Sequence, residues 1–376
     1  MKKVVLSFLM SISILVCSAQ GKLIRKLLSN EKDTTRKASF MPVPVLGYAQ
    51  ETGVELGLGA IYSLYLDRKD TLNRSSNFYG MGSYSTKGTY SVTLKGDVWT
   101  KGNKHHLIGD IRFKDMPFNF YGLGNNTLAA NEDKLVQRSI KMLFDAEKSF
   151  VAKSYSGVSL GFENYSFTDK MADGIFAQDP LIFDKDGGSV VFIGVSQSLD
   201  TRNSNNFPTK GFFGRISYQY APDIFGGDNF KGSQLKLNLR SFWSFTPKIV
   251  LGVQAIYHTV QSNHTPFYML PQLGNDEIMR GYYAGRYRDE NLLQGQAEIR
   301  YRFMNRFAFV AFAGLGKVFN NNEVNLNHFK PNYGVGGRYF FDTAKGLSVR
   351  FDYGVGEKRP GEKRQTGFYI GLGEAF

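Results

Sequence analysis

Side chains that commonly carry catalysis or hold metal ions are scarce in this sequence. The chain has five histidines and one cysteine, and the histidines lack the spacing of zinc ligands on one helix. His264 and Asp276 fall in one predicted loop and could meet as a catalytic pair, although loop histidines are common. No phosphate-binding glycine motif lies between a strand and a helix. We therefore expect no enzyme activity, no catalytic residue, no cofactor and no metal site.

The N-terminus has the features of a secretory signal peptide. Two lysines precede a mostly apolar stretch of thirteen residues at 4–16, and small residues follow up to Ala19. This pattern predicts a signal peptide over residues 1–19, cleaved between Ala19 and Gln20. A first transmembrane helix would need a longer apolar stretch. Lipidation of Cys17 is a second alternative, but a valine precedes that cysteine.

The composition limits the partners of the exported chain. The formal net charge is +13, and it is +11 without the two lysines of the signal peptide. Such a charge favours nucleic acid, anionic lipid or an electropositive lumen. Because an exported protein has little access to nucleic acid, we exclude that partner. Cleavage would also remove the one cysteine, which excludes disulfides and thiolate sites.

Apolar and polar residues alternate along most of the chain. The pattern is clearest at 53–66, 292–303 and 347–355, and it recurs at 90–98, 212–220 and 235–239. Alternation predicts strands with one apolar and one polar face. Several runs reach about ten residues, the length of a tilted membrane strand, and aromatic residues lie near their ends. The sequence therefore predicts an all-β protein that forms a transmembrane antiparallel β-barrel.

The length of the repeating region suggests sixteen strands. Residues 40–376 would give about 21 residues to each strand and its connection; fourteen or eighteen strands also fit, whereas eight do not. We predict a signal peptide at 1–19, a short periplasmic segment at 20–39 and a barrel domain at 40–376. The longer polar stretches are predicted to be extracellular loops: 67–77, 116–137, 168–188 and 261–291.

Five short segments add a family resemblance. In chain order they lie at 42–53, 120–127, 200–211, 279–282 and 367–376. With these motifs in this order, the mature chain resembles the BamA/TamA family of outer-membrane barrels, also called the bacterial surface antigen family. The resemblance implies a monomeric barrel integral to the bacterial outer membrane, in contact with its lipids, with an extracellular loop folded into the lumen.

The part of the resemblance that implies a function is the Arg-Gly-aromatic motif at Arg280, Gly281 and Tyr282. In the family, the arginine of this loop meets acidic residues of the barrel wall. Glu298 and Asp352 lie on the polar faces of their strands and are the candidate partners. A guanidinium in a narrow lumen needs such a carboxylate, and bidentate pairing fixes its position. The alternative is that Arg280 is one more solvated loop arginine.

Two departures from the family affect the inherited mechanism. The family often has an aspartate within a late Phe-x-Asp-x-Gly strand, where this chain has Gly314. The loop arginine must therefore use another acid. BamA and TamA also carry periplasmic POTRA domains before the barrel, whereas here only the segment 20–39 lies there. We therefore expect a separate periplasmic partner or client polypeptide.

The last predicted strand resembles a barrel-assembly signal. Phe368, Ile370, Leu372 and Phe376 are predicted to share one face, which Glu374 interrupts. Glycines on the other face would weaken packing at a lateral gate between the first and last strands. Alternatively, these glycines merely give room to the inward loop.

The resemblance implies a barrel that assists insertion or export of proteins or lipids through a weak lateral seam gated by the Arg280 loop. One alternative is a passive pore that prefers anions, because Arg300, Arg302 and Arg350 are predicted to face the lumen. Another is a structural surface antigen.

Overall fold

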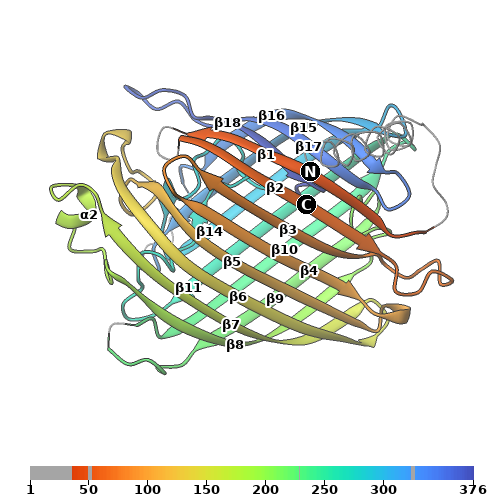
Figure 1. Cartoon of the computed structure of the whole chain (residues 1–376), viewed down its shortest axis with the longest axis horizontal. Coiled ribbons are helices and arrows are strands. Elements are labelled where there is room, and N and C mark those ends of the chain that lie inside the picture. The colour runs from red at the N-terminus through yellow and green to blue at the C-terminus, as the bar shows by residue number, and fades with distance from the viewer. Residues whose placement is uncertain (1–35, 50–52, 228, 323–326) are drawn as a thin grey trace, which may run out of the picture.

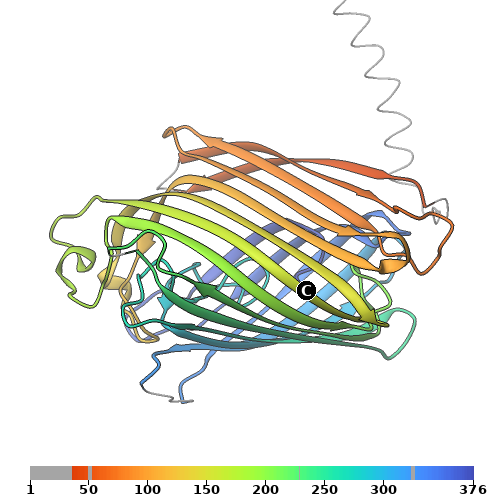
Figure 2. The same cartoon turned by 90° about the horizontal axis from the view of Figure 1, so that it is seen from below.

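The computed structural model describes residues 36–49, 53–227, 229–322 and 327–376, so the predicted cleavage site at Ala19 and Gln20 lies outside the described residues. Within these ranges, sixteen strands form one antiparallel sheet that curls into a barrel (Figures 1 and 2). Each strand pairs with its neighbours in chain order. The strands are β1 (Ser39–Ala49), β2 (Gly53–Leu64), β3 (Ser76–Ser85), β4 (Tyr90–Trp99), β5 (His105–Phe120), β6 (Asp133–Val151), β7 (Ser154–Asp169), β8 (Gly187–Asp200), β9 (Gly211–Ala221), β10 (Gly232–Ser244), β11 (Ile249–Gln261), β14 (Asn291–Tyr301), β15 (Phe307–Phe319), β16 (Lys330–Asp342), β17 (Leu347–Val355) and β18 (Thr366–Leu372).

The all-β fold and the count of sixteen strands predicted from the sequence are confirmed for the described residues. The alternating run predicted at 347–355 is β17, and the run at 53–66 is β2, which ends at Leu64. Helix is limited to η1 (Lys101–Asn103), η2 (Ala129–Asn131) and α2 (Ile175–Gln178). Across the described ranges, no helix has the length and apolar character needed to cross a membrane.

Apolar side chains point outward from the strands, and polar ones point into the lumen. On β7, Val158 and Leu160 are 63% and 55% exposed, whereas Ser159 between them is buried. On β14, Ile299 is exposed, whereas the flanking Glu298 is fully buried. This arrangement is the reverse of a water-soluble sheet protein and is the one that lipid around a barrel favours.

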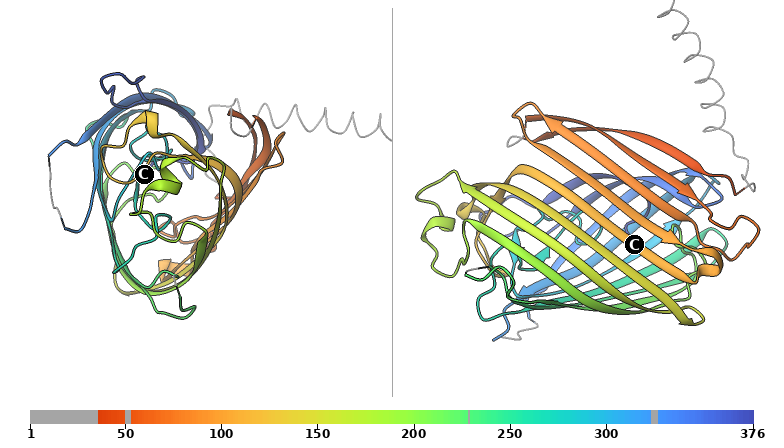
Figure 3. Two further views of the ribbon diagram at one scale, coloured as in Figure 1. Left: turned by 90° about the vertical axis from the view of Figure 1, so that its left-hand side faces the viewer. Right: turned by 60° about the horizontal axis from the view of Figure 1, so that its bottom comes forward.

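The connections divide between two ends of the barrel because consecutive strands are antiparallel. One end, here called the long-loop end, holds the β5–β6, β7–β8 and β11–β14 connections. At this end, α2 and other connecting segments lie across the opening of the barrel (Figure 3, left). The prediction that 67–77 is an extracellular loop is wrong, because the β2–β3 connection lies at the opposite end. There, Arg74 pairs with Asp200 at the end of β8, at 2.5 Å. Polarity and length mark a loop but do not tell which end it occupies.

The predicted loop at 116–137 is also largely strand. β5 continues to Phe120 and β6 begins at Asp133, so the connection spans 121–132. The inward-facing side chains at these strand ends are apolar and enter an aromatic cluster inside the long-loop end. Its fully buried members include Phe120, Leu135 and Phe267. This cluster holds the β11–β14 connection against the β5–β8 wall.

Candidate functional site

The connection between β11 and β14, residues 262–290 and here called the inward loop, folds into the barrel. Its two short strands, β12 (Gln272–Leu273) and β13 (Tyr287–Arg288), pair with each other. Leu273, Met279 and Tyr282 of the loop are buried with Val318 of the wall. An apolar cluster of this kind fixes the loop within the lumen.

Arg280 lies at the buried tip of the inward loop, and its side chain is fully buried. Its Nη1 is 2.6 Å from the Asp352 carboxylate on β17, and its Nη2 forms an ion pair with Glu298 on β14. Nη2 also donates to Gln296 Oε1 at 3.2 Å. The guanidinium carbon lies 3.5 Å from the ring centroid of Phe312 on β15. The Arg280 side chain therefore contacts three wall strands at once, β14, β15 and β17.

The two carboxylates that bind Arg280 are shared with wall arginines. Glu298 also pairs with Arg300 at 3.0 Å. Asp352 also accepts from Arg338 at 2.6 Å and from Arg350 at 3.3 Å. We call this set the latch network, and its eight charged members are Arg280, Arg300, Arg338, Arg350, Asp276, Glu298, Asp352 and Glu374. Four positive and four negative charges give a formal net charge of zero, which reduces the cost of burying the seven of them other than Asp276, whose side chain is 55% exposed.

The two residues after Arg280 anchor the backbone of the loop tip. Gly281 has a φ of 108°, and an added Cβ would lie 2.8 Å from the backbone of Val355. The Gly281 N–H donates to Tyr369 Oη on β18 at 2.9 Å. The Tyr282 hydroxyl accepts from the backbone N–H of Glu357 at 3.0 Å. Burial raises the pKa of Tyr282, which keeps this hydroxyl protonated at neutral pH.

Gly314 occupies the position where the family resemblance implies an aspartate. A Cβ added there would lie 2.6 Å from Asn332 Oδ1. The space is used by Asn332, whose Nδ2 donates to the backbone carbonyl oxygen of Arg280 at 3.0 Å. The wall thus holds the arginine backbone through Asn332, while Glu298 and Asp352 hold its side chain.

Of the three arginines on which the pore alternative rests, two have carboxylate partners and the third, Arg302, is held by a carbonyl oxygen and an aromatic ring. Arg300 and Arg350 are buried in the latch network, and Arg350 also pairs with Asp276 at 2.6 Å. Arg302 donates from Nε to the carbonyl oxygen of Asn305 at 3.0 Å and lies 4.0 Å from the ring centroid of Phe340. These contacts remove the main support for an anion pathway lined by these arginines.

The predicted assembly signal is split between β18 and a turn after it. Phe368 and Ile370 face outward, at 65% and 52% exposure, and β18 ends at Leu372. Gly373 then adopts a φ of 82°, and Phe376 is buried in the lumen. The prediction that Phe376 shares the outward face is therefore wrong, because the left-handed turn at Gly373 ends the alternation.

Residues 374–376 join the latch network from the end of the barrel opposite the long loops. Glu374 pairs with Arg338 at 2.8 Å. The Phe376 carbonyl oxygen accepts from Arg300 at 2.9 Å, and its ring lies 5.8 Å from that of Phe242. Sequence reasoning missed this role. The signal available was Glu374 itself, a charge that interrupts an apolar face.

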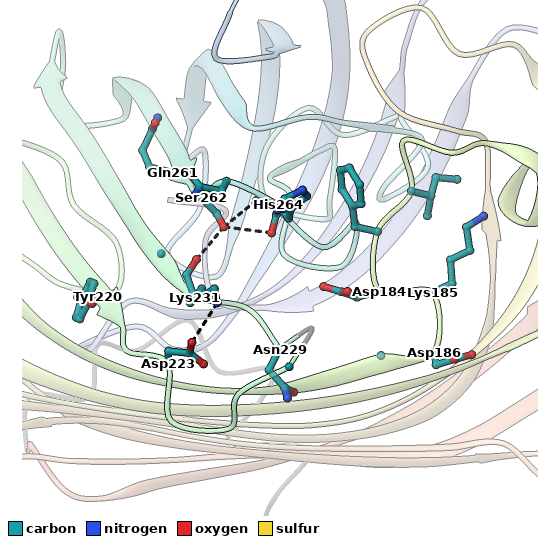
Figure 4. A pocket seen from close by; sticks show the side chains of 16 residues that line it. Asp184, Lys185, Asp186, Tyr220, Asp223, Asn229, Lys231, Gln261, Ser262 and His264 are labelled. Carbon is teal, nitrogen blue, oxygen red and sulfur yellow. Dashed lines mark hydrogen bonds and ion pairs between the residues drawn. The ribbon is translucent and has the colours of Figure 1, made fainter.

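The structure does not bring His264 and Asp276 together. Asp276 pairs with Arg350, whereas His264 lines a cleft of about 1280 Å³ at the long-loop end (Figure 4). The His264 ring lies 5.1 Å from that of Phe183. In the described part of the chain, no group of three or more His, Cys, Asp or Glu residues could hold a metal ion.

Comparisons with known proteins agree with this geometry. BamA from Haemophilus ducreyi, in a structure lacking POTRA domains 1–3, has a TM-score of 0.54 and 15% identity over 90% of this chain and 70% of that chain. CdiB from Acinetobacter baumannii has a TM-score of 0.54 and 12% identity over 89% of this chain. CdiB from Escherichia coli has a TM-score of 0.56 and 9% identity over 90% of this chain.

The extent of these matches limits what each of them shows. This chain spans 59% and 62% of the two CdiB chains, and at such identities the likeness establishes the fold alone. No curated protein sequence matches the chain. Residues 45–376, however, match the model of the Omp85 superfamily domain. The chain therefore belongs to the Omp85 superfamily and has the fold of its outer-membrane β-barrels.

Proposed function

We propose that the protein assists the insertion or export of proteins or lipids at the outer membrane, through a weak lateral seam between β1 and β18 that the inward loop gates. The observation that carries this proposal is the buried Arg280, which is bound to carboxylates on β14 and β17. A loop held by ion pairs has a discrete seated position, which a gate requires.

The contacts of the loop tip support coupling to the seam. β1 and β18 are the first and last strands of the sheet order. The Gly281 N–H is bound to Tyr369 of β18, so a displaced loop would lose a direct contact with that edge strand. Gly367 and Gly371 on the lumen face of β18 give this strand few side-chain contacts. A client that pairs with an edge strand would then meet a low barrier.

We propose that the partners are outer-membrane lipids, a client polypeptide and a separate periplasmic protein. The resemblance to BamA and TamA motivates this proposal, since those proteins receive clients through POTRA domains. The inward loop would keep the lumen closed until a client binds at the seam.

A reversible cross-link tests gating. A Cβ added at Gly316 would lie 3.1 Å from the Met279 side chain, so Met279→Cys with Gly316→Cys should lock the loop to β15. In a deletion strain, the locked protein should fail to restore the outer-membrane content of proteins and lipids, and a reductant should restore it. Each single cysteine variant is the control.

The possible outcomes separate gating from the broader function. Full restoration by the locked protein would refute gating by the inward loop. An unchanged outer membrane in the deletion strain would refute the insertion or export function itself.

A further inference from the structure

The outer surface of the wall between β3 and β7 is hollowed. The hollow, here called the outer-wall groove, has a volume of about 560 Å³, within the range of about 300–1,000 Å³ that small-molecule sites occupy. Asp145 and Ser159 border it, but both side chains are buried, and Asp145 pairs with Arg215 at 2.8 Å. Every other lining residue is apolar or glycine. The larger lining side chains point away from the lumen and are 43–63% exposed: Phe78, Leu107, Phe144, Val158 and Leu160.

Two opposite glycines form the floor of the groove. Strand register places Phe78 of β3 opposite Gly96 of β4, and Gly96 opposite Gly109 of β5. Gly109 in turn lies opposite Phe144 of β6. A Cβ added at Gly96 would lie 3.8 Å from the Phe78 ring, and one added at Gly109 would lie 3.7 Å from the Phe144 ring. The row thus has an aromatic ring at each end and no side chain between them. Since neighbouring strands lie about 4.8 Å apart, β3 and β6 are roughly 14 Å apart across the groove.

A hydrocarbon chain is the occupant that suits this site. The outward face of the barrel is the face that lipid covers, and an apolar hollow does not hold ordered water. Methylene groups that enter the groove gain contacts with the two rings and with the glycine backbone between them. The groove should therefore retain an acyl chain more strongly than the flat wall beside it does.

Two lysines lie where the groove approaches the end of the barrel opposite the long loops. Along β6, the outward-facing residues that follow Phe144 are Ala146, which lines the groove, and then Lys148. Two residues of strand place Lys148 about 6.7 Å beyond Ala146. The Ser149 N–H donates to the carbonyl oxygen of Lys104 at 2.9 Å, so Lys104 lies beside the same strand end. Both lysines are exposed, and neither forms an ion pair within the described ranges.

These lysines suit the headgroup of a lipid whose chain lies in the groove. Lysine side chains near the ends of membrane segments extend to the interface, where phosphate groups lie. Two adjacent lysines without ion pairs favour an anionic headgroup over a zwitterionic one.

We propose that the outer-wall groove binds one acidic phospholipid, with an acyl chain over Gly96 and Gly109 and the phosphate beside Lys104 and Lys148. The proposal does not depend on the lateral seam, and it goes beyond the proposed insertion or export function.

Native mass spectrometry of the purified full barrel, in detergent with added dioleoyl phosphatidylglycerol, tests the groove. The wild type should retain one lipid per barrel, and Gly96→Leu/Gly109→Leu, which fills the floor, should weaken binding about tenfold. Gly295→Leu/Gly337→Leu is the matched control and should bind like the wild type. Both of these glycines point outward, on β14 and β16, and an added Cβ meets nothing closer than 3.4 Å. Equal binding by the wild type and Gly96→Leu/Gly109→Leu would overturn the proposal. A dimer that forms without lipid and is lost in Gly96→Leu/Gly109→Leu would also overturn it, and would assign the groove to a second copy of the chain.

A second comparison tests the headgroup and leaves the groove intact. Lys104→Gln/Lys148→Gln should weaken the binding of phosphatidylglycerol about tenfold or more and leave the binding of dioleoyl phosphatidylcholine unchanged. Lys104→Arg/Lys148→Arg keeps the charge and should keep the affinity. The control Lys210→Gln/Lys248→Gln removes two exposed lysines from other connections at the same end and should bind like the wild type. Equal binding of the two lipids by the wild type, or equal weakening in the control, would overturn the proposal.

Discussion

Two parts of the barrel wall hold basic side chains against the lumen, and they compensate the charge differently. In the latch network of β14–β18 and the inward loop, four arginines face four carboxylates. Elsewhere on the lumen side, on β5, β10 and the same loop, Lys114, Lys236 and Arg288 have no ion-pair partner within the described ranges. A count of basic residues would treat both regions alike. Pairing shows that the first region fixes the position of a loop, whereas the second leaves its charges without that constraint.

The largest difference should appear when one carboxylate is removed from each region. Asp352→Ala leaves Arg280, Arg338 and Arg350 without a shared partner and should destabilise the barrel by about 3–5 kcal/mol. Glu163→Ala on the other wall should cost less, about 1–2 kcal/mol, because it removes one pair with the partly exposed Lys141 and one hydrogen bond from the Tyr165 hydroxyl. The free energy of unfolding of both variants can be measured in urea, with the change in gel mobility of the barrel as the signal. Equal costs would contradict the assigned difference.

The close packing of the loop tip against the wall gives a second test. Gly281→Ala combines a positive φ with a clash against Val355 and should cost about 1–3 kcal/mol, seen as faster proteolysis of the inward loop. Gly361→Ala is a matched control, because its φ is 76° but nothing lies within 4 Å of an added Cβ. If both variants behave alike, backbone strain and not wall contact explains the effect.

The inward loop should also respond to pH. Burial raises the pKa of Asp289, in the loop segment that follows β13, to about 6. A raised pKa means that the folded state favours the protonated carboxyl. The stabilisation is therefore complete below the pKa of the unfolded chain and is lost as the pH rises through about 6. Allowing for partial exposure, the thermal midpoint should fall between pH 5 and pH 8 by the equivalent of about 1 kcal/mol or less.

Asp289→Asn is the control for that pH dependence. The variant should lose the part of the change between pH 5 and pH 8 that centres near pH 6. An unchanged pH profile in the variant would assign the effect to another group.

The smallest predicted effect has the opposite sign. Lys236→Gln removes an exposed charge without an ion pair and should raise stability by no more than about 0.5 kcal/mol at low salt. High salt should reduce that gain, because it screens the repulsion between Lys236 and the other positive charges of the lumen. A loss of stability at low salt would mean that Lys236 has a structural partner after all.

Local patterns were sufficient to predict the fold from the sequence. Alternation has a period of two residues, so it indicated strands such as β17 and the candidate acids Glu298 and Asp352 on polar faces. Contacts across the lumen were not predictable in this way. The pairing of Arg338 with Asp352 depends on strand register, and the burial of Phe376 depends on one turn at Gly373. Whether the seated loop acts as a gate stays a prediction.

The sequence separation within the latch network bears on the order of assembly. Arg300 and its acceptor Phe376 are 76 positions apart, and Arg280 and Asp352 are 72 positions apart. Contacts between such distant residues form slowly, because a long chain segment must be ordered first. Arg280 can meet Glu298, only 18 positions away, at an early stage, but its pair with Asp352 forms only after β17 has joined the sheet. We expect the loop to be seated in one of the last steps of biogenesis, so a newly inserted barrel passes through a stage with an open lumen.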